Sequence, residues 1–487
     1  MIRLLLPAAL FVGATTAIAQ QAPERQPPVL APVDLTAPIV SDHVGTFAGK
    51  RVPYRAHVEA FEAKGLDDRP TARIAAISYI ATDASPERPV LFVFNGGPIG
   101  PSAILHMGAF GPKRVAVPDD IDAPPSTFRF VDNPHTVLDV ADLVFFDPAG
   151  TGFSRLLPGV DPKSQFGNVA DSRQLQQLVL EWTRAHGREK SPVYLVGESY
   201  GTMRAPEAAK QLAAVGRAPA GLILIGQAVN IIEYAQRRGN IISYAVSLPT
   251  LAAAAWWHDR AERGGRDFER FIKDAQDYGG GEYLSVLFAG DTAPLERRQA
   301  AARRLQEFTG IGADYWLDNA LRMTKVEYQR ALFPGRMLDT NDARYVGPAD
   351  GPSPFAAVIQ AYQTAIQRYV ATDLKAGGLG EYNHRNPFTG GLNDWDWGPN
   401  KSPFGDWPYA RAITELFEEN PDFRLFVANG YYDTQTTIGA MDYLLSQSNW
   451  PRERVRSAYY QGGHMPYSID ASLEAMMNDV RAVVAGR

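Results

Sequence analysis

The fold of this chain is decided by the stretch Val193-Tyr194-Leu195-Val196-Gly197-Glu198-Ser199-Tyr200-Gly201. Four apolar or aromatic residues lead directly into the pattern Gly-x-Ser-x-Gly. This pattern is typical of a nucleophile elbow, in which a strand ends, the backbone turns sharply at the serine and a helix begins. Glycine on either side of the turn avoids collisions between side chains and the neighbouring backbone. The stretch therefore predicts that Ser199 sits above a helix N-terminus, whose free N–H groups favour negative charge.

Short apolar runs recur on both sides of this elbow, with helical patterns between them. Runs that are apolar throughout, separated by helices, indicate parallel strands that are buried on both faces of a sheet. The sequence therefore predicts an α/β fold of the α/β-hydrolase type, with a mostly parallel central sheet flanked by helices. The predicted buried strands are 90–94, 143–147, 193–196, 221–225 and 425–428, and residues 54–63 and 73–81 are predicted to form an antiparallel hairpin at the sheet edge.

A serine at such an elbow needs a histidine partner that follows it in the chain. His464 lies in Gln461-Gly462-Gly463-His464-Met465-Pro466-Tyr467, a loop where a packed core histidine is not expected. Only two other histidines follow Ser199. His258 stands in an apolar helical context, which favours a core or surface role, and His384 lies in an irregular polar stretch and stays a weaker alternative.

The acid of such a triad lies between the serine and the histidine in chain order. Asp433 comes three residues after the predicted strand 425–428 breaks at Asn429-Gly430. A turn or helix N-cap aspartate would explain Asp433 alone equally well. Together, the elbow, the acid after a strand and the loop histidine predict a catalytic triad of Ser199, Asp433 and His464.

Acyl transfer at a serine also needs N–H donors for the oxyanion. The backbone N–H of Tyr200, directly after the nucleophile, is one such donor. The predicted strand 90–94 opens into Asn95-Gly96-Gly97-Pro98. Consecutive glycines let the backbone approach a substrate carbonyl closely, so this loop is predicted to supply the second donor.

Several motifs in this order give the chain a resemblance to the serine carboxypeptidases (peptidase family S10). They are Asn95-Gly96-Gly97-Pro98, Asp147-Pro148-Ala149-Gly150-Thr151-Gly152-Phe153-Ser154, Gly197-Glu198-Ser199-Tyr200-Gly201 with Pro206, Asn429-Gly430-Tyr431-Tyr432-Asp433 and Gly463-His464-Met465. The glutamate before the serine is the most specific mark. The chain has no cysteine, so it is more similar to bacterial-type members without disulfides.

The resemblance assigns further roles. It implies that the N–H groups of Gly97 and Tyr200 form the oxyanion hole, and that Asn95 and Glu198 hydrogen-bond the free carboxylate of a peptide substrate. Ile99 stands where the family usually has glycine, which is a departure in the oxyanion loop. No cofactor is expected, and no cluster with metal-ligand or nucleotide-binding spacing is visible, so no metal is expected either.

The N-terminus predicts export. Met1-Ile2-Arg3, the apolar run 4–12 and Ala17-Ile18-Ala19 form the pattern of a signal peptide over residues 1–19, so a periplasmic or secreted location is expected. The run is too short for a membrane span, and no other run sustains 18 apolar residues, so no membrane anchoring is expected. The formal net charge is −6 with acids and bases interspersed, which argues against nucleic-acid binding.

Composition and patterning divide the rest of the chain. Residues 20–50 are predicted as a Pro-rich leader, 51–229 as the first half of the α/β core and 398–487 as its second half. Between them, residues 230–397 show only helical patterns, which predicts a helical cap inserted over the active site.

Three functions compete on these residues. The first is an exported serine carboxypeptidase that releases C-terminal residues from peptides through an acyl-enzyme intermediate. The second is an esterase or acyltransferase on the same scaffold, because acyl-enzyme chemistry does not fix which nucleophile resolves it. A non-enzymatic binding protein is disfavoured because all three triad residues are present. The expected partner is a peptide with a free C-terminus, and the oligomeric state stays open.

Overall fold

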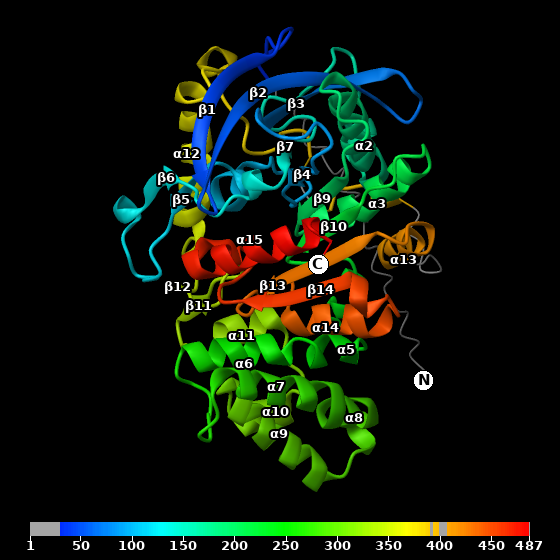
Figure 1. Ribbon diagram of the computed structural model, residues 1–487. Coiled ribbons are helices and arrows are strands. Elements are labelled where there is room, and N and C mark those ends of the chain that lie inside the picture. The colour runs from blue at the N-terminus through cyan, green and yellow to red at the C-terminus, as the bar shows by residue number, and fades with distance from the viewer. Residues whose placement is uncertain (1–29, 390–392, 399–406, 487) are drawn as a thin grey trace, which may run out of the picture.

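The computed structural model describes residues 30–389, 393–398 and 407–486, so the predicted signal peptide over residues 1–19 lies outside the described residues. A ten-stranded sheet forms the centre of this part of the chain (Figure 1). Its strands are β1 (Ile39–Phe47), β2 (Lys50–Lys64), β3 (Pro70–Ala81), β4 (Val90–Phe94), β7 (Asp142–Phe146), β8 (Arg155–Leu156), β9 (Val193–Glu198), β10 (Gly221–Ile225), β13 (Arg424–Gly430) and β14 (Val455–Tyr460).

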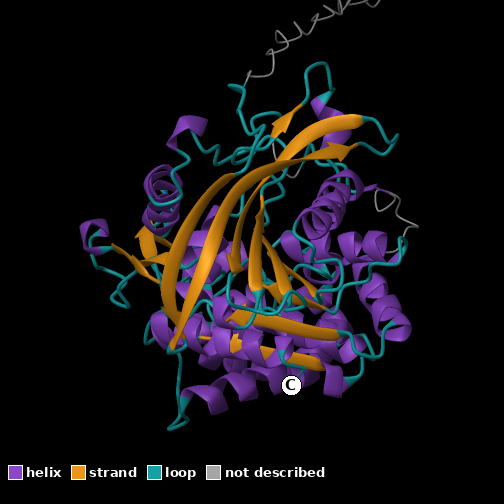
Figure 2. Ribbon diagram, turned by 45° about the horizontal axis from the view of Figure 1, so that its top comes forward, coloured by secondary structure: helices purple, strands orange, loops and turns teal. Residues whose placement is uncertain are grey.

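The strand order is β1-β2-β3-β7-β4-β9-β10-β13-β14, with β8 paired to β3. Neighbours are parallel from β7 to β14 and antiparallel from β1 to β7. The long antiparallel strands curve across one side of the sheet (Figure 2). This sheet confirms the predicted α/β fold with a mostly parallel core.

Helices cover both faces of the sheet, as the continuously apolar strands require. Along β4, Val90 and Phe92 belong to the core on one face, whereas Leu91 and Val93 belong to the core on the other. The first face is covered by α2 (Asn168–Ala185), α3 (Gly201–Ala213), α13 (Tyr409–Glu419) and α14 (Ile438–Gln447), and the second by α1 (Ala103–Leu105), α12 (Ala356–Thr372) and α15 (Asp470–Val484). Within the described ranges, no helix has both the length and the apolar character that a membrane span needs.

The leader predicted over residues 20–50 is wrong at its C-terminal end. Residues 39–47 form β1, which pairs with β2 along its whole length, from Ile39 opposite Val58 to Phe47 opposite Lys50. The prolines before residue 39 set the composition of the region, but none lies within β1 to interrupt its hydrogen bonds. The outermost strand on this side is therefore β1, and not the predicted hairpin.

The segment predicted as a helical cap, residues 230–397, divides into two parts. Helices α5 to α11 gather at one end of the molecule beside β13 and β14, and they share a hydrophobic core of their own (Figure 1). These helices are α5 (Ile241–Ala245), α6 (Leu248–Trp257), α7 (Phe268–Tyr278), α8 (Leu284–Ala289), α9 (Leu295–Thr309), α10 (Ala313–Asp318) and α11 (Lys325–Ala331). The short helix α4 (Ile231–Tyr234) comes before them and packs through Ile231 against the core under α2 and α3.

The rest of this segment differs from an all-helical cap. A short antiparallel pair, β11 (Arg336–Leu338) and β12 (Val346–Pro348), follows the helices. Helix α12 then packs on the main core through Tyr362 and Tyr369, and not on the other cap helices. Helical periodicity identifies an apolar face but not the surface that covers it, so the sequence could not separate α12 from its neighbours. A second small antiparallel pair, β5 (Lys113–Ala116) and β6 (Arg129–Asp132), contacts α12, where the ring of Phe130 meets that of Tyr369.

Candidate active site

The elbow is formed where β9 ends and α3 begins. Ser199 lies between them with a φ of 58°, a left-handed conformation that is uncommon for residues other than glycine. A Cβ on Gly197 would collide with the carbonyl oxygen of Gly201, so the turn needs glycine there. The Ser199 N–H donates to the carbonyl of Ile225 on the neighbouring strand (2.9 Å), which fixes the strained residue to the sheet.

Asp433 and His464 come from loops that follow the neighbouring strands β13 and β14, and they meet in a buried pair. The distance from His464 Nδ1 to Asp433 Oδ2 is 2.7 Å. Asp433 is fully buried and His464 is 3% exposed. The other Asp433 oxygen accepts the backbone N–H groups of Gln435 (2.8 Å) and Thr436 (3.0 Å). This carboxylate is therefore held as an acceptor for Nδ1–H, which leaves the His464 Nε2 lone pair free to take a proton.

The electrostatics of this pair favour a basic imidazole. Burial alone lowers the pKa of His464, but the charge and hydrogen bond of Asp433, together with the charge of Glu198, raise it above its ordinary value. A histidine whose cationic form is stabilised in this way is a stronger base when neutral.

Ser199 and His464 line one cavity of about 230 Å3. Among the described residues, Ser199 Oγ has no hydrogen-bond partner, and in substrate-free enzymes the serine–histidine contact is often long. Of the other predicted site residues, Asn95, Gly97 and Glu198 also line this cavity. The remaining wall comes from Gly96, Gly100, Pro101, Ala103, Ile104, Asn341, Gln363, His384, Gln435 and Met465.

The loop after β4 packs directly against the elbow. A Cβ on Gly96 would lie 2.5 Å from the Tyr200 nitrogen, so only glycine allows this approach. Gly97 is exposed and has a φ of 62°, while Tyr200 lies at the N-terminus of α3. Ile99 is partly buried against the α2/α3 core, and its N–H donates to the Gly97 carbonyl. The departure at Ile99 is thus accommodated by packing, with Gly97 left accessible from the cavity.

Asn95 and Glu198 form a hydrogen-bonded pair at the cavity wall. Asn95 Nδ2 donates to Glu198 Oε1 (3.2 Å), and Asn95 Oδ1 accepts the N–H of Leu105 (3.0 Å), which fixes the orientation of the amide. Tyr467 donates its hydroxyl to the other Glu198 oxygen. The sequence reasoning did not identify Tyr467, although it lies only three residues after His464.

Burial raises the pKa of Glu198 to about 7, although His464, Tyr467 and Asn95 oppose the shift. The carboxyl therefore keeps its proton in mildly acidic solution and can donate it to an ionised substrate carboxylate. Above about pH 7, Glu198 ionises and repels that carboxylate. Because Glu198 and His464 interact electrostatically, their proton losses are coupled.

We expect the KM for a peptide substrate to rise as the pH increases through about 7, because a peptide C-terminus is ionised above about pH 3.5. In contrast, kcat should rise with pH as His464 loses its proton. An ester without a free carboxylate should show only the second effect. Steady-state kinetics from pH 5 to 8.5 test this, with Glu198→Gln as the variant in which the peptide KM becomes independent of pH. A constant KM in the wild-type protein would contradict the role of Glu198.

The loop after β4 is anchored by Arg204, a fully buried arginine on α3 that the sequence analysis did not identify. Its guanidinium pairs with the buried Asp171 (Nε to Oδ2, 2.7 Å) and donates to the Asn95 carbonyl (2.7 Å). Tyr200 also donates its hydroxyl to Asp171 (3.0 Å). Arg204 thus ties the loop after β4 and helix α2 to the helix that begins at the nucleophile. The sequence did contain one signal for this role, because Arg204 is a charged residue within the elbow helix, five positions after the serine.

Replacing Arg204 with methionine should lower the free energy of unfolding by about 3–5 kcal/mol, because the Asp171 carboxylate would remain buried without its partner. Urea denaturation followed by circular dichroism measures the change. The control is Arg411→Met, which breaks the exposed ion pair with Glu415 and should leave stability nearly unchanged. Combining Arg204→Met with Asp171→Leu should restore part of the loss. Equal stability of Arg204→Met and the wild type would contradict the anchoring role.

The two alternative histidines lie in different surroundings. His258 Nε2 contacts the carbonyl of Ala343 (2.7 Å), and His258 does not line the catalytic cavity. His384 does line it, but among the described residues no carboxylate hydrogen-bonds His384. The geometry therefore favours His464 over both as the partner of Ser199.

The cavity that contains the predicted site residues is smaller than two other hollows on the molecule. A hollow of about 690 Å3 between residues 65–71 and 159–170 contains none of the predicted site residues. A second hollow, of about 770 Å3, runs along α12 and shares Gln363 and His384 with the catalytic cavity. The smaller cavity is the one lined by both Ser199 and His464, so the residues that line a cavity, and not its volume, identify the candidate site.

A family model of the serine carboxypeptidases matches residues 78–219. This segment contains Asn95, Gly97, Glu198, Ser199 and Tyr200, and it ends before Asp433 and His464. The match covers less than a third of the chain, so it shows a resemblance to the serine carboxypeptidases in this segment. The resemblance seen in the motifs is thereby confirmed for the segment that contains the elbow.

A solved structure with a TM-score above 0.5 supports the fold. The prohormone-processing carboxypeptidase Kex1 from Saccharomyces cerevisiae is 13% identical, with a TM-score of 0.55 over 89% of this chain and 91% of its own. A carboxyl esterase from Bacillus coagulans is also 13% identical, with a TM-score of 0.37 over 88% of this chain and 99% of its own. No curated protein matches significantly.

Proposed function

We propose that this protein releases single residues from the C-terminus of peptides, with Ser199 as nucleophile, His464 as general base and Asp433 as the group that orients the histidine. The observation that carries the proposal is the shared cavity. It brings the elbow serine and the Asp433-bound His464 together with Asn95 and Glu198, a hydrogen-bonded pair suited to a carboxylate.

The reaction follows from these positions. Ser199 Oγ attacks the carbonyl carbon of the last peptide bond while His464 Nε2 takes the hydroxyl proton. The N–H groups of Gly97 and Tyr200 stabilise the oxyanion. His464 then returns the proton to the leaving amine, which departs as the free C-terminal amino acid. Water, activated by the same histidine, hydrolyses the acyl-enzyme and regenerates Ser199.

The surroundings of the site support a peptide substrate. Glu198 and Asn95 hold the C-terminal carboxylate on one side of the scissile bond. The groove along α12 that shares Gln363 and His384 with the cavity provides room for the rest of the peptide on the other side. This arrangement limits cleavage to the last bond, because a chain that continued beyond it would meet the buried Asn95–Glu198 pair.

We also propose that the protein acts outside the cytoplasm, on the basis of the signal-peptide pattern over residues 1–19. Mass spectrometry of the protein recovered from the periplasm or the medium tests this. The expected N-terminus is Gln20. A chain that retains residues 1–19 in the cytoplasm would contradict the proposal.

The carboxylate role predicts strong discrimination between a peptide and its C-terminal amide. Amidation removes the charge that Asn95 and Glu198 bind, so kcat/KM should fall by about 100-fold or more, since a buried polar site left unpaired costs several kcal/mol. The assay compares one N-blocked peptide as acid and as amide. The control Asn95→Ala should lose most of this discrimination while it retains activity on a simple ester.

Equal turnover of the acid and the amide would favour the second candidate, an esterase or acyltransferase. Ile99, which stands where the family usually has glycine, is the observation that keeps this alternative open, since it lies two residues from the Gly97 donor.

A further inference from the structure

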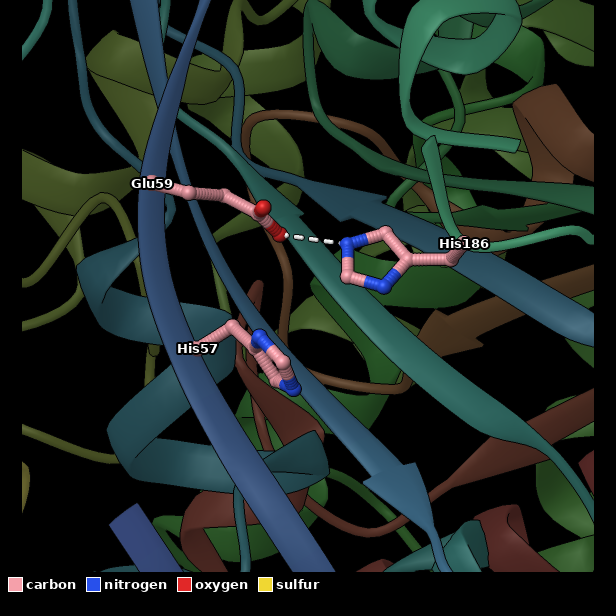
Figure 3. Close-up of side chains that lie close together, drawn as sticks. All are labelled: His57, Glu59 and His186. Carbon is pink, nitrogen blue, oxygen red and sulfur yellow. Dashed lines mark hydrogen bonds and ion pairs between the residues drawn. The ribbon is translucent and has the colours of Figure 1, made fainter. Parts of the chain in front are cut away.

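Away from the catalytic cavity, three potential metal ligands meet. His57 and Glu59 lie on β2, and His186 lies at the C-terminal end of α2 (Figure 3). Residues two positions apart on a strand point to the same face, so His57 and Glu59 both face the helix. One ligand atom from each of the three side chains lies within 4.8 Å of the others.

The contacts within this cluster leave a negative charge incompletely balanced. Glu59 is buried, and its carboxylate contacts His186 Nε2 (2.8 Å) and accepts a longer hydrogen bond from Ser78 (3.4 Å). No arginine or lysine among the described residues pairs with Glu59. The nearby guanidinium groups are engaged elsewhere, with Arg88 and Arg188 on Asp142 and Arg55 on Asp42.

A buried carboxylate between two imidazoles needs a cation, which can be a proton on histidine or a metal ion. The ring of His57 faces that of His186 edge-on, with centroids 5.1 Å apart. Two imidazoles and a carboxylate are a donor set that suits zinc and related transition metals, and not magnesium or calcium.

We propose that His57, Glu59 and His186 bind a divalent transition-metal ion, with Zn2+ as the preferred occupant, and thereby link β2 to the end of α2. Ligand atoms around tetrahedral zinc are about 3.3 Å apart, so rotations of the side chains from their present positions are enough to form the site. His57 and His186 are only partly buried, which leaves a path for the ion and room for a water ligand. None of the three residues lines the catalytic cavity.

The sequence analysis expected no metal because the pattern is not local. His57-x-Glu59 is too short to be diagnostic, and His186 lies 127 residues away from Glu59. Only the packing of α2 on β2 brings the third ligand to the other two.

Isothermal titration of the chelator-treated full chain with Zn2+ tests the site. We expect one equivalent to bind and to raise the melting temperature, with no such effect from Mg2+. His57→Gln and His186→Gln should each weaken Zn2+ binding by at least about 10-fold, since losing even an outer partner of a ligand costs that much. The matched control is His43→Gln on β1, another half-buried histidine, and His464→Ala excludes binding at the catalytic site. Both controls should bind Zn2+ as the wild type does.

Zinc binding that is absent, or that survives both cluster variants, would overturn the proposal. If either variant fails to fold, X-ray absorption of the wild-type chain with one equivalent of Zn2+ decides instead. Two imidazole nitrogens in the first shell support the site. Any other number overturns it and leaves the cluster as a histidine–carboxylate ion pair.

Discussion

Ser199→Ala and His464→Ala are each expected to lower kcat by about 10^4- to 10^6-fold, while the protein stays folded. Alanine at position 199 removes the proposed nucleophile, and alanine at position 464 removes the proposed base that accepts its proton. Residues of a triad act as a unit, so the loss of either one approaches the loss of all three. Steady-state hydrolysis of an N-blocked peptide measures the effect, and circular dichroism confirms the fold.

A fluorophosphonate probe gives an independent reading of the same assignment. It should label the wild-type protein at Ser199 and leave Ser199→Ala unlabelled. Full activity of either alanine variant, or a label on another serine, would refute the triad.

Asp433→Asn should lower kcat by about 10^3-fold or more with little change in KM. The amide can donate a hydrogen bond to His464 Nδ1, which favours the tautomer whose Nε2 carries the proton and cannot act as a base. The stabilisation of the protonated imidazole by Asp433 is lost as well, so the pKa of His464 should fall below its wild-type value. The kcat–pH profile of the variant should therefore shift to lower pH.

The control for this variant is Asp442→Asn, which changes a partly buried aspartate. Asp442 accepts hydrogen bonds from Gln276 and Tyr459 and does not line the catalytic cavity. Its kcat should stay close to that of the wild type. If both variants lose activity to the same degree, a general loss of structure would explain the result. The specific role of Asp433 in orienting His464 would then be contradicted.

The parts of this protein that local patterns determine could be predicted from the sequence. The strands 90–94 and 221–225 coincide with β4 and β10, because each is a short apolar run bounded by polar or glycine-rich segments. Ser199 and His464 could be predicted as site residues because glycines and a proline beside them mark a sharp turn and a loop in the sequence. The structure places both residues at one cavity.

The features that could not be predicted from the sequence depend on contacts between distant segments of the chain. The pairing of β1 with β2 was hidden by the neighbouring prolines, and the surface covered by α12 is a matter of tertiary packing. The ion pair of Arg204 with Asp171 and the cluster around Glu59 each join residues from distant parts of the sequence, so no local sequence pattern predicts them. The partners of these buried charged groups are brought together only by the tertiary structure. They can therefore be identified from the structure but not from the sequence.

The central claim, that this chain removes residues from peptide C-termini with Ser199, is tested most directly by mass spectrometry of an N-blocked peptide library. The account predicts products that shorten by one C-terminal residue at a time in the wild-type reaction and no products with Ser199→Ala. Internal cleavage, loss of residues from the N-terminus of unblocked peptides, or shortening that persists in Ser199→Ala would contradict it.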